Sequence, residues 1–126
     1  MADVAKVREQ SSSGRAGALW LIQAMTGLLL IGLLALHMTA HHFVVEGGLR
    51  TFAEVVAYVA NPAIFFLEVT FLVIVTIHAL LGVRAVIVDL GPGRRAVRTL
   101  DTLLWIVGTA VITYGVWLLI VIRGSG

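Results

Sequence analysis

His78, Gly82 and Asp89 are the residues whose types and spacing first indicate chemistry in this sequence. At about 100° per helical residue, offsets of +4 and +11 from His78 place all three within roughly 40° of one helix face. That face would carry an imidazole able to ligate a metal, a position without a side chain where a flat ring could lie, and a carboxylate. The run that contains them, residues 63–88, is apolar enough to cross a bilayer, where every ionisable group needs a partner or a function.

The composition predicts an all-α membrane protein. A chain of 126 residues is too short for two domains. Its composition, 60% hydrophobic and 13% charged, is too apolar for a soluble domain. Stretches with few or no charges predict three transmembrane helices, at about residues 16–45, 62–90 and 100–122. Residues 1–15 should form a polar cytoplasmic tail, mobile or ordered only against a partner, before a transmembrane anchor of residues 16–126. In the third helix, small residues such as Gly108 and Gly115 indicate close packing rather than chemistry.

A short helix is also expected at about residues 49–60, lying in the membrane interface. Phe52 and Val59 belong to an apolar set that recurs there at helical spacing, with polar residues on the other side. An irregular loop is the alternative. Asn61 followed by Pro62 would then start the second transmembrane helix, as an N-cap followed by proline at the first helical position.

The positions of the positive charges predict the orientation. Arginines and a lysine precede the first transmembrane helix, and three arginines follow the second. Because positive residues favour the cytoplasmic side, the amino terminus and the second connection should face the cytoplasm, with the first connection and the carboxyl terminus outside. The net charge of +2 comes from residues near helix ends and gives no reason to expect nucleic-acid binding.

Histidine must hold any redox centre in this chain. The absence of cysteine excludes iron–sulfur clusters, thiolate zinc sites, thioether-attached haem and disulfides. His37 and His78 lie on helices of opposite direction and should differ in depth by about 15 Å at 1.5 Å per residue, so they should not share one iron. If both bind haem, two haems are stacked across the membrane, and each takes its second axial ligand from another chain.

The other polar residues of the transmembrane helices are open to several interpretations. Gln23 and Thr26 share one side of the first helix with His37, so this side should face protein rather than lipid. His41 and His42 are expected to be solvated or to face headgroups. A hydrogen-bonded helix anchor is favoured over a proton relay for Glu68, and even His37 and His78 could simply bond to neighbouring helices. Arg84 could reach the cytoplasmic headgroups or neutralise a haem propionate.

Residues 78–89, HALLGVRAVIVD, resemble the H-A-x-x-G-[IV]-R-x-x-x-x-D signature of the cytochrome b membrane-anchor subunit of succinate dehydrogenase, respiratory complex II. Residues 20–27 are similar to the start of the family's first helix, Leu36-His37 to the histidine late in that helix, and Asn61-Pro62 with Glu68 to the start of its second. The likeness extends over nearly all of residues 20–105. Two similar anchor subunits pair in this family, and the wording around His78 favours the cytochrome b subunit over the paired hydrophobic anchor subunit.

The resemblance implies a haem-binding helix bundle shared with a second hydrophobic anchor subunit. One or two haems b would be shared with the partner chain, with His78 as an axial ligand of the iron and His37 as the ligand of a second haem in two-haem members. Gly82 would make room for the porphyrin, and Arg84 would lie close to the propionates. The family implies an iron–sulfur subunit and a flavoprotein subunit as further partners, and a multi-pass location among the lipids of the bacterial cytoplasmic (inner) membrane.

The resemblance also implies a ubiquinone or menaquinone site at the cytoplasmic helix ends, beside the iron–sulfur subunit. The candidate residues here are Gln23, Thr26 and Asp89. The family usually has His-Arg where this chain has Gln23-Ala24, and the arginine helps bind quinone. Because that cationic donor is missing, the quinone site should be remodelled or completed by the partner chain.

The leading interpretation is a membrane-anchor and electron-transfer subunit of succinate:quinone oxidoreductase. It is non-catalytic alone, because the sequence provides no flavin site and no cluster ligands. One alternative is a haem-free structural anchor whose histidines only bond neighbouring helices. Another is a small transporter or proton-conducting protein in which Glu68, His78 and Asp89 form a relay.

Overall fold

The computed structural model describes residues 2–44 and 51–125. For residues 2–13 and residue 44 it describes the backbone alone. The described residues form helices and no strand. In chain order the elements are α1 (Ala2–Thr39), the π-helix η1 (Ala40–Val44), α2 (Phe52–Ala60), α3 (Pro62–Asp89) and α4 (Arg94–Arg123).

Three helical segments of the described chain are long and apolar enough to span a membrane: Gly14–Phe43, Pro62–Asp89 and Arg94–Arg123. The predicted all-α membrane protein with three transmembrane helices is therefore confirmed. Two helices begin earlier than predicted, because α1 starts at Ala2 and α4 at Arg94. Once a helix has nucleated, each further hydrogen bond requires only one more residue to be fixed, so helix-compatible polar residues can extend the helix beyond the apolar run.

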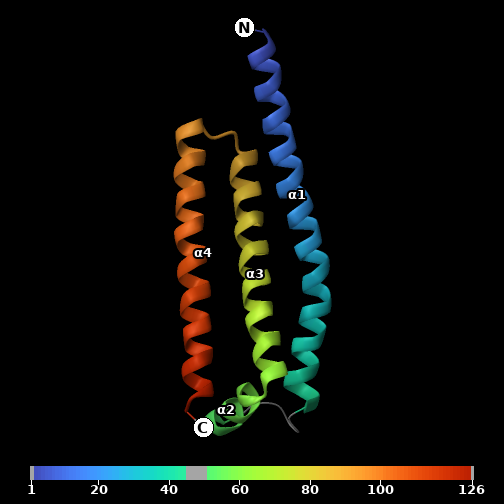
Figure 1. The fold of residues 1–126 in the computed structure, drawn as a ribbon, viewed down its shortest axis with the longest axis vertical. Helices are drawn as coiled ribbons and strands as arrows, with labels where there is room; N and C mark the ends of the chain where they lie inside the picture. The colour runs from blue at the N-terminus through green and yellow to red at the C-terminus, as the bar shows by residue number, and fades with distance from the viewer. Residues whose placement is uncertain (1, 45–50, 126) are drawn as a thin grey trace.

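The three long helices lie side by side, with α3 between α1 and α4 (Figure 1). α2 lies across the end of this layer where α1 ends and α3 begins, and the carboxyl end of the chain is at the same end (Figure 1). The amino end and the α3–α4 connection are at the other end. In that connection Gly91 has a φ of 70°, a left-handed conformation that favours glycine because a side chain would be strained there.

Local side-chain bonds explain where α2 and α3 begin. Thr51 and Glu54 form a capping box, in which the Glu54 N–H donates to Thr51 Oγ1 over 3.3 Å and the Thr51 N–H donates to the Glu54 carboxylate over 2.8 Å. The predicted short helix is thus confirmed from Phe52 onward, although residues 49 and 50 lie outside the described residues. Asn61 caps α3 by accepting from the Ala63 N–H over 2.9 Å, and Pro62 is at the first helical position, as predicted.

Glycines bring α4 close to α3. A Cβ atom at Gly108 would lie 2.7 Å from Leu80 Cδ1, and one at Gly115 would lie 2.5 Å from Leu72 Cδ2. No real Cβ packs that closely, so only glycine fits at these two positions without movement of the leucines. The close packing predicted for these glycines is confirmed.

Candidate functional site

His78 of α3 faces α1 at a level where the two helices are in close contact. Its Nδ1 lies 3.1 Å from Thr26 Oγ1. A Cβ at Gly27 would lie 3.0 Å from His78 Cε1 and 4.0 Å from Nε2, so the imidazole packs directly on the glycine backbone. The predicted polar side of the first helix therefore faces protein at Thr26.

The surroundings of Thr26 fix the proton on the His78 ring. The Thr26 hydroxyl lies 2.8 Å from the Ile22 carbonyl oxygen and 3.1 Å from that of Gln23. A hydroxyl has one proton, and Thr26 donates it to this backbone, as threonines within helices commonly do. Thr26 Oγ1 then accepts from His78 Nδ1–H, which leaves the lone pair on Nε2. No described residue forms a hydrogen bond with that Nε2.

Gln23 lies one turn from Thr26 and contacts α3 at Gly82. A Cβ at Gly82 would lie 3.2 Å from Gln23 Nε2, so the gap predicted beside His78 exists but the Gln23 amide fills it. Gln23 Oε1 is buried and has no hydrogen-bond partner among the described residues. A buried amide oxygen without a donor is unfavourable, so a ligand that donates a hydrogen bond to Gln23 Oε1 would stabilise this arrangement.

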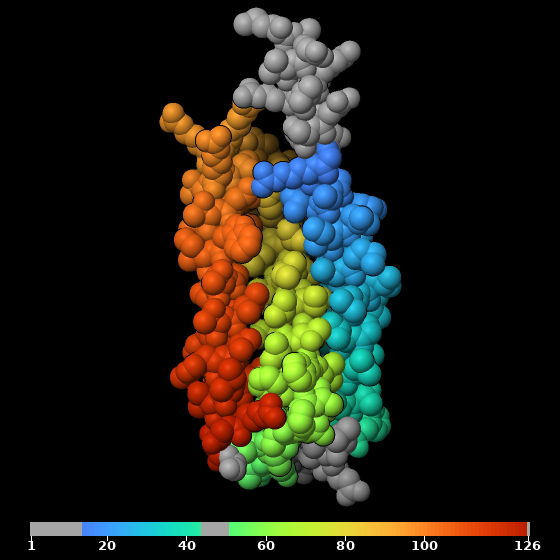
Figure 2. Space-filling view, viewed as in Figure 1, coloured from blue at the N-terminus to red at the C-terminus, as the bar shows by residue number. Residues whose placement is uncertain are grey.

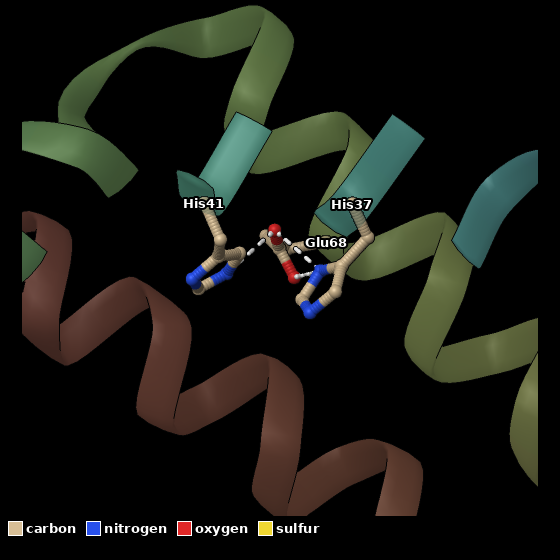
Figure 3. A group of neighbouring side chains, drawn as sticks. All are labelled: His37, His41 and Glu68. Carbon is tan, nitrogen blue, oxygen red and sulfur yellow. Dashed lines mark hydrogen bonds and ion pairs between the residues drawn. The ribbon is translucent and has the colours of Figure 1, made fainter. Parts of the chain in front are cut away.

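A second polar cluster joins α1, η1, α2 and α3 at the other end of the bundle. His37 Nδ1 lies 3.0 Å from Glu68 Oε1 and 2.9 Å from Oε2. His41 Nε2 lies 3.6 Å from Glu68 Oε1, and Tyr58 donates its hydroxyl proton to that oxygen over 2.9 Å. Figure 3 shows Glu68 between the two imidazoles. The His37 ring also stacks on Phe71, with centroids 4.8 Å apart.

This second polar cluster, centred on Glu68, contradicts one prediction and confirms two. His41 is half-buried against Glu68 and Tyr58 rather than solvated, because α2 folds beneath the end of α1 and covers it. His42 is exposed, as expected. Glu68 is the predicted hydrogen-bonded anchor, since it accepts from a side chain of α2 and pairs with one of α1.

Burial raises the pKa of the Tyr58 hydroxyl above its usual range, and its hydrogen bond to Glu68 adds to this effect. Tyr58 therefore stays protonated across the physiological range and always acts as a donor to the carboxylate. The donor holds Glu68 Oε1, which His41 also approaches, and leaves Oε2 to His37.

The two histidine centres are separate. His37 pairs with Glu68, whereas His78 pairs with Thr26. His78 follows Glu68 by ten positions in α3, which is about 15 Å along the helix axis. This separation agrees with the predicted difference in depth and excludes one iron between the two imidazoles.

Arg84 forms an ion pair that the sequence analysis missed. Its Nε donates to Asp101 Oδ1 over 2.6 Å, and a second nitrogen lies 3.4 Å from Oδ2. Arg84 is therefore paired with α4 while its side chain stays partly exposed, and the third transmembrane helix supplies an ion pair as well as the expected packing. The available signal was the near symmetry of the hairpin, since Arg84 lies seven residues before the Gly91-Pro92-Gly93 turn and Asp101 eight residues after it.

A groove of about 480 Å³ lies over α3 between α1 and α4. In Figure 2, α3 is recessed between the other two helices in the half of the molecule nearer the amino end. Arg15, Arg84 and Asp101 supply charge to a lining that is otherwise mainly apolar. The three predicted quinone residues do not line this groove: Gln23 and Thr26 face α3, and Asp89 is exposed at the end of α3.

The sequence profile of the succinate dehydrogenase/fumarate reductase transmembrane subunit family matches residues 5–117. The chain belongs to this family. The matched region of this transmembrane subunit includes both histidine centres and the Arg84–Asp101 pair. No solved structure matches the chain.

One relative of this succinate dehydrogenase/fumarate reductase transmembrane subunit is the succinate dehydrogenase hydrophobic membrane anchor subunit of Archaeoglobus fulgidus. The two are 39% identical over 103 residues, which cover 79% of this chain and 85% of the relative. The relative has the name of the paired hydrophobic anchor subunit, whereas the sequence motif around His78 favours the cytochrome b subunit. The resemblance to succinate dehydrogenase anchors is confirmed, and membership of this family makes the chain a multi-pass membrane protein.

Proposed function

We propose that this transmembrane subunit binds haem b through His78 and helps transfer electrons between an iron–sulfur subunit and membrane quinone in a succinate:quinone oxidoreductase. The observation that carries the proposal is the hydrogen bond between His78 Nδ1 and Thr26. Metal-bound histidines almost always donate their second ring N–H to an acceptor, which fixes the tautomer and the ring orientation. His78 already has this arrangement, and its Nε2 lone pair is available for iron.

The residues around His78 fit a haem. Haem would supply one-electron exchange, with a potential set by its axial ligands and surroundings. Gly27 lets the His78 imidazole pack against α1, and the Gln23 amide that fills the space at Gly82 keeps its Oε1 without a partner among the described residues. Because no hydrogen bond from a described residue holds that oxygen, the amide can turn away from Gly82 at a small cost in free energy.

A partner chain is part of the proposal. His37 is about 15 Å from the level of His78, so it cannot serve as the second axial ligand. We assign that ligand to a second hydrophobic anchor subunit, with the iron–sulfur and flavoprotein subunits on the cytoplasmic side. The arginine distribution supports a cytoplasmic amino terminus and a location in the cytoplasmic membrane.

The role of Arg84 toward a propionate stays a prediction. Arg84 lies about 120° around α3 from His78, and it already pairs with Asp101. It would have to exchange the Asp101 carboxylate for a propionate. Guanidinium binds both groups with the same geometry, so the exchange is chemically balanced.

Gln23 is the residue that best supports a quinone site in this chain. Its amide can donate to a quinone carbonyl, and its unpartnered Oε1 can accept from a quinol hydroxyl. Thr26 is less suited to this role, because the backbone and His78 already use its hydroxyl. Asp89 is exposed at the end of α3, where its carboxylate could contact a partner subunit.

The second haem predicted at His37 also stays a prediction. The Glu68 carboxylate at His37 Nδ1 is the kind of second partner that metal-bound histidines have, which favours a metal at this residue. A relay through Glu68, His78 and Asp89 has no such support, because Glu68 bonds to His37 and Tyr58 while His78 bonds to Thr26.

The test is a reduced-minus-oxidised visible spectrum of the purified complex, with His78→Ala compared with the wild type. We expect a b-type band that this substitution removes. His42→Ala is the control, because His42 is an exposed histidine of the same chain. Absence of a b-type band in the wild type would leave a haem-free anchor, and a band unchanged by His78→Ala would refute the ligand assignment.

A further inference from the structure

We propose that His37, His41 and Glu68 form a binding site for a divalent transition-metal cation of the Zn²⁺ type. One ligand atom from each of the three side chains lies within 4.8 Å of those of the other two. All three side chains are half-buried, and Figure 3 shows both imidazoles directed at the carboxylate. The site does not depend on haem at His78, and it is an alternative to a second haem at His37.

The distances suit a tetrahedral ion. With metal–ligand bonds of about 2.0–2.1 Å, neighbouring donor atoms in a tetrahedral site are roughly 3.3 Å apart. His37 Nδ1 lies 2.9 Å from Glu68 Oε2, and His41 Nε2 lies 3.6 Å from Glu68 Oε1. These two spacings lie on both sides of the required value, and donor atoms that are no more than 4.8 Å apart would have to approach one another by at most about 1.5 Å to reach it.

The donor set selects the class of cation. Two imidazoles and one carboxylate suit Zn²⁺, Ni²⁺ or Cu²⁺, whereas Ca²⁺ and Mg²⁺ require mainly oxygen ligands. In the described structure the cluster already contains its orienting partner. Tyr58 donates to Glu68 Oε1 and thereby directs Oε2 toward His37. Three protein ligands would leave a fourth position for water.

The backbone at His41 provides an independent observation. His41 lies in the π-helix Ala40–Val44, directly after the regular α-helix ends at Thr39. π-Helical turns are rare and are frequently found at functional sites. Here the turn brings an imidazole that would otherwise face headgroups against a carboxylate of another helix. The bound ion would therefore cross-link α1 and η1 to α3, with α2 as a cover.

The site can be tested with Co²⁺ as a coloured substitute for Zn²⁺. The purified complex, prepared without a histidine tag, is titrated with Co²⁺ and the visible d–d absorption is recorded; Zn²⁺ is then added as competitor. We expect one Co²⁺ per chain, displaced by Zn²⁺. His41→Ala should weaken binding by at least about 10-fold, and Glu68→Gln should do the same. The matched control His42→Ala should bind as the wild type does.

The outcomes separate this inference from the proposed function. The His78-dependent b-type band, measured in the same samples, reports whether each variant is folded and assembled. Loss of Co²⁺ binding in His41→Ala with that band intact supports the metal site. Absence of binding in the wild type, binding unchanged by His41→Ala, or a second b-type centre lost in His37→Ala would overturn it. A Co²⁺ site in a complex without a b-type band would refute the haem proposal alone.

Discussion

The hydroxyl oxygen of Thr26 lies 3.1 Å from Nδ1 of His78, and this contact joins the two transmembrane helices where the sequence places its clearest chemistry. The hydroxyl proton goes to the backbone of α1, so the imidazole is the donor and its other nitrogen keeps a lone pair. A threonine of the neighbouring helix thus fixes the His78 tautomer that the proposed haem ligation requires.

Replacing Thr26 with valine tests this arrangement, because valine keeps the shape and removes the acceptor. We expect Thr26→Val to weaken haem retention by about 10-fold or more, since second partners of metal-bound histidines contribute on this scale. Haem content per chain measures the effect. Thr26→Ser is the control and should retain haem as the wild type does. Equal retention by the valine variant would show that the hydrogen bond does not orient His78.

Gly27 permits the close approach of the His78 ring. A Cβ there would lie 3.0 Å from His78 Cε1, so Gly27→Ala should displace the imidazole and shift or reduce the b-type band. Gly32→Ala is the matched control on the same helix, because a Cβ at Gly32 meets nothing within 4 Å. A band affected equally by both variants would mean that helix propensity, and not contact with His78, causes the change.

Tyr58 predicts a pH dependence of stability. Its pKa is raised in the folded chain by burial and by Glu68, so the folded state favours the protonated hydroxyl. The stabilisation is complete below the unfolded-state pKa of about 10 and is lost as pH rises through that value toward the folded-state pKa. The melting temperature of the wild type should therefore fall above about pH 10 more steeply than that of Tyr58→Phe. Parallel curves would show that this hydroxyl is not held by the fold.

The Arg84–Asp101 pair predicts a modest effect on stability. Both side chains are partly exposed, at 23% and 30%, so solvent screens the interaction. Asp101→Asn should cost about 1 kcal/mol in the free energy of unfolding, and the double substitution Arg84→Asp with Asp101→Arg should recover part of it. Denaturant unfolding of the wild type, Arg84→Asp, Asp101→Arg and the double variant measures the coupling. No coupling in this cycle would mean that the ion pair contributes nothing measurable.

The transmembrane helices could be predicted from sequence because hydrophobic length is a local property. The Asn61-Pro62 helix start and the close approach at Gly108 and Gly115 follow from equally local rules, and the structure shows all of them. The earlier start of α1 at Ala2 was missed because a transmembrane pattern does not report how far a helix continues into polar residues.

The partners of the polar residues were harder to predict, because they depend on how helices pack. His41 was expected to be solvated since its own helix places it near the surface, but α2 covers it. Asp101 was missed because its partner lies on another helix, across the hairpin turn. Helical spacing shows which residues share a face, and only the packed bundle shows what that face meets.

A density map of the purified complex at side-chain resolution is the most direct test of the central claim. The account predicts a planar porphyrin with its iron at His78 Nε2, an axial ligand from a partner chain on the opposite side, and Nδ1 still bonded to Thr26. A map in which His78 Nε2 bonds only to a protein side chain, with no cofactor beside it, would contradict it.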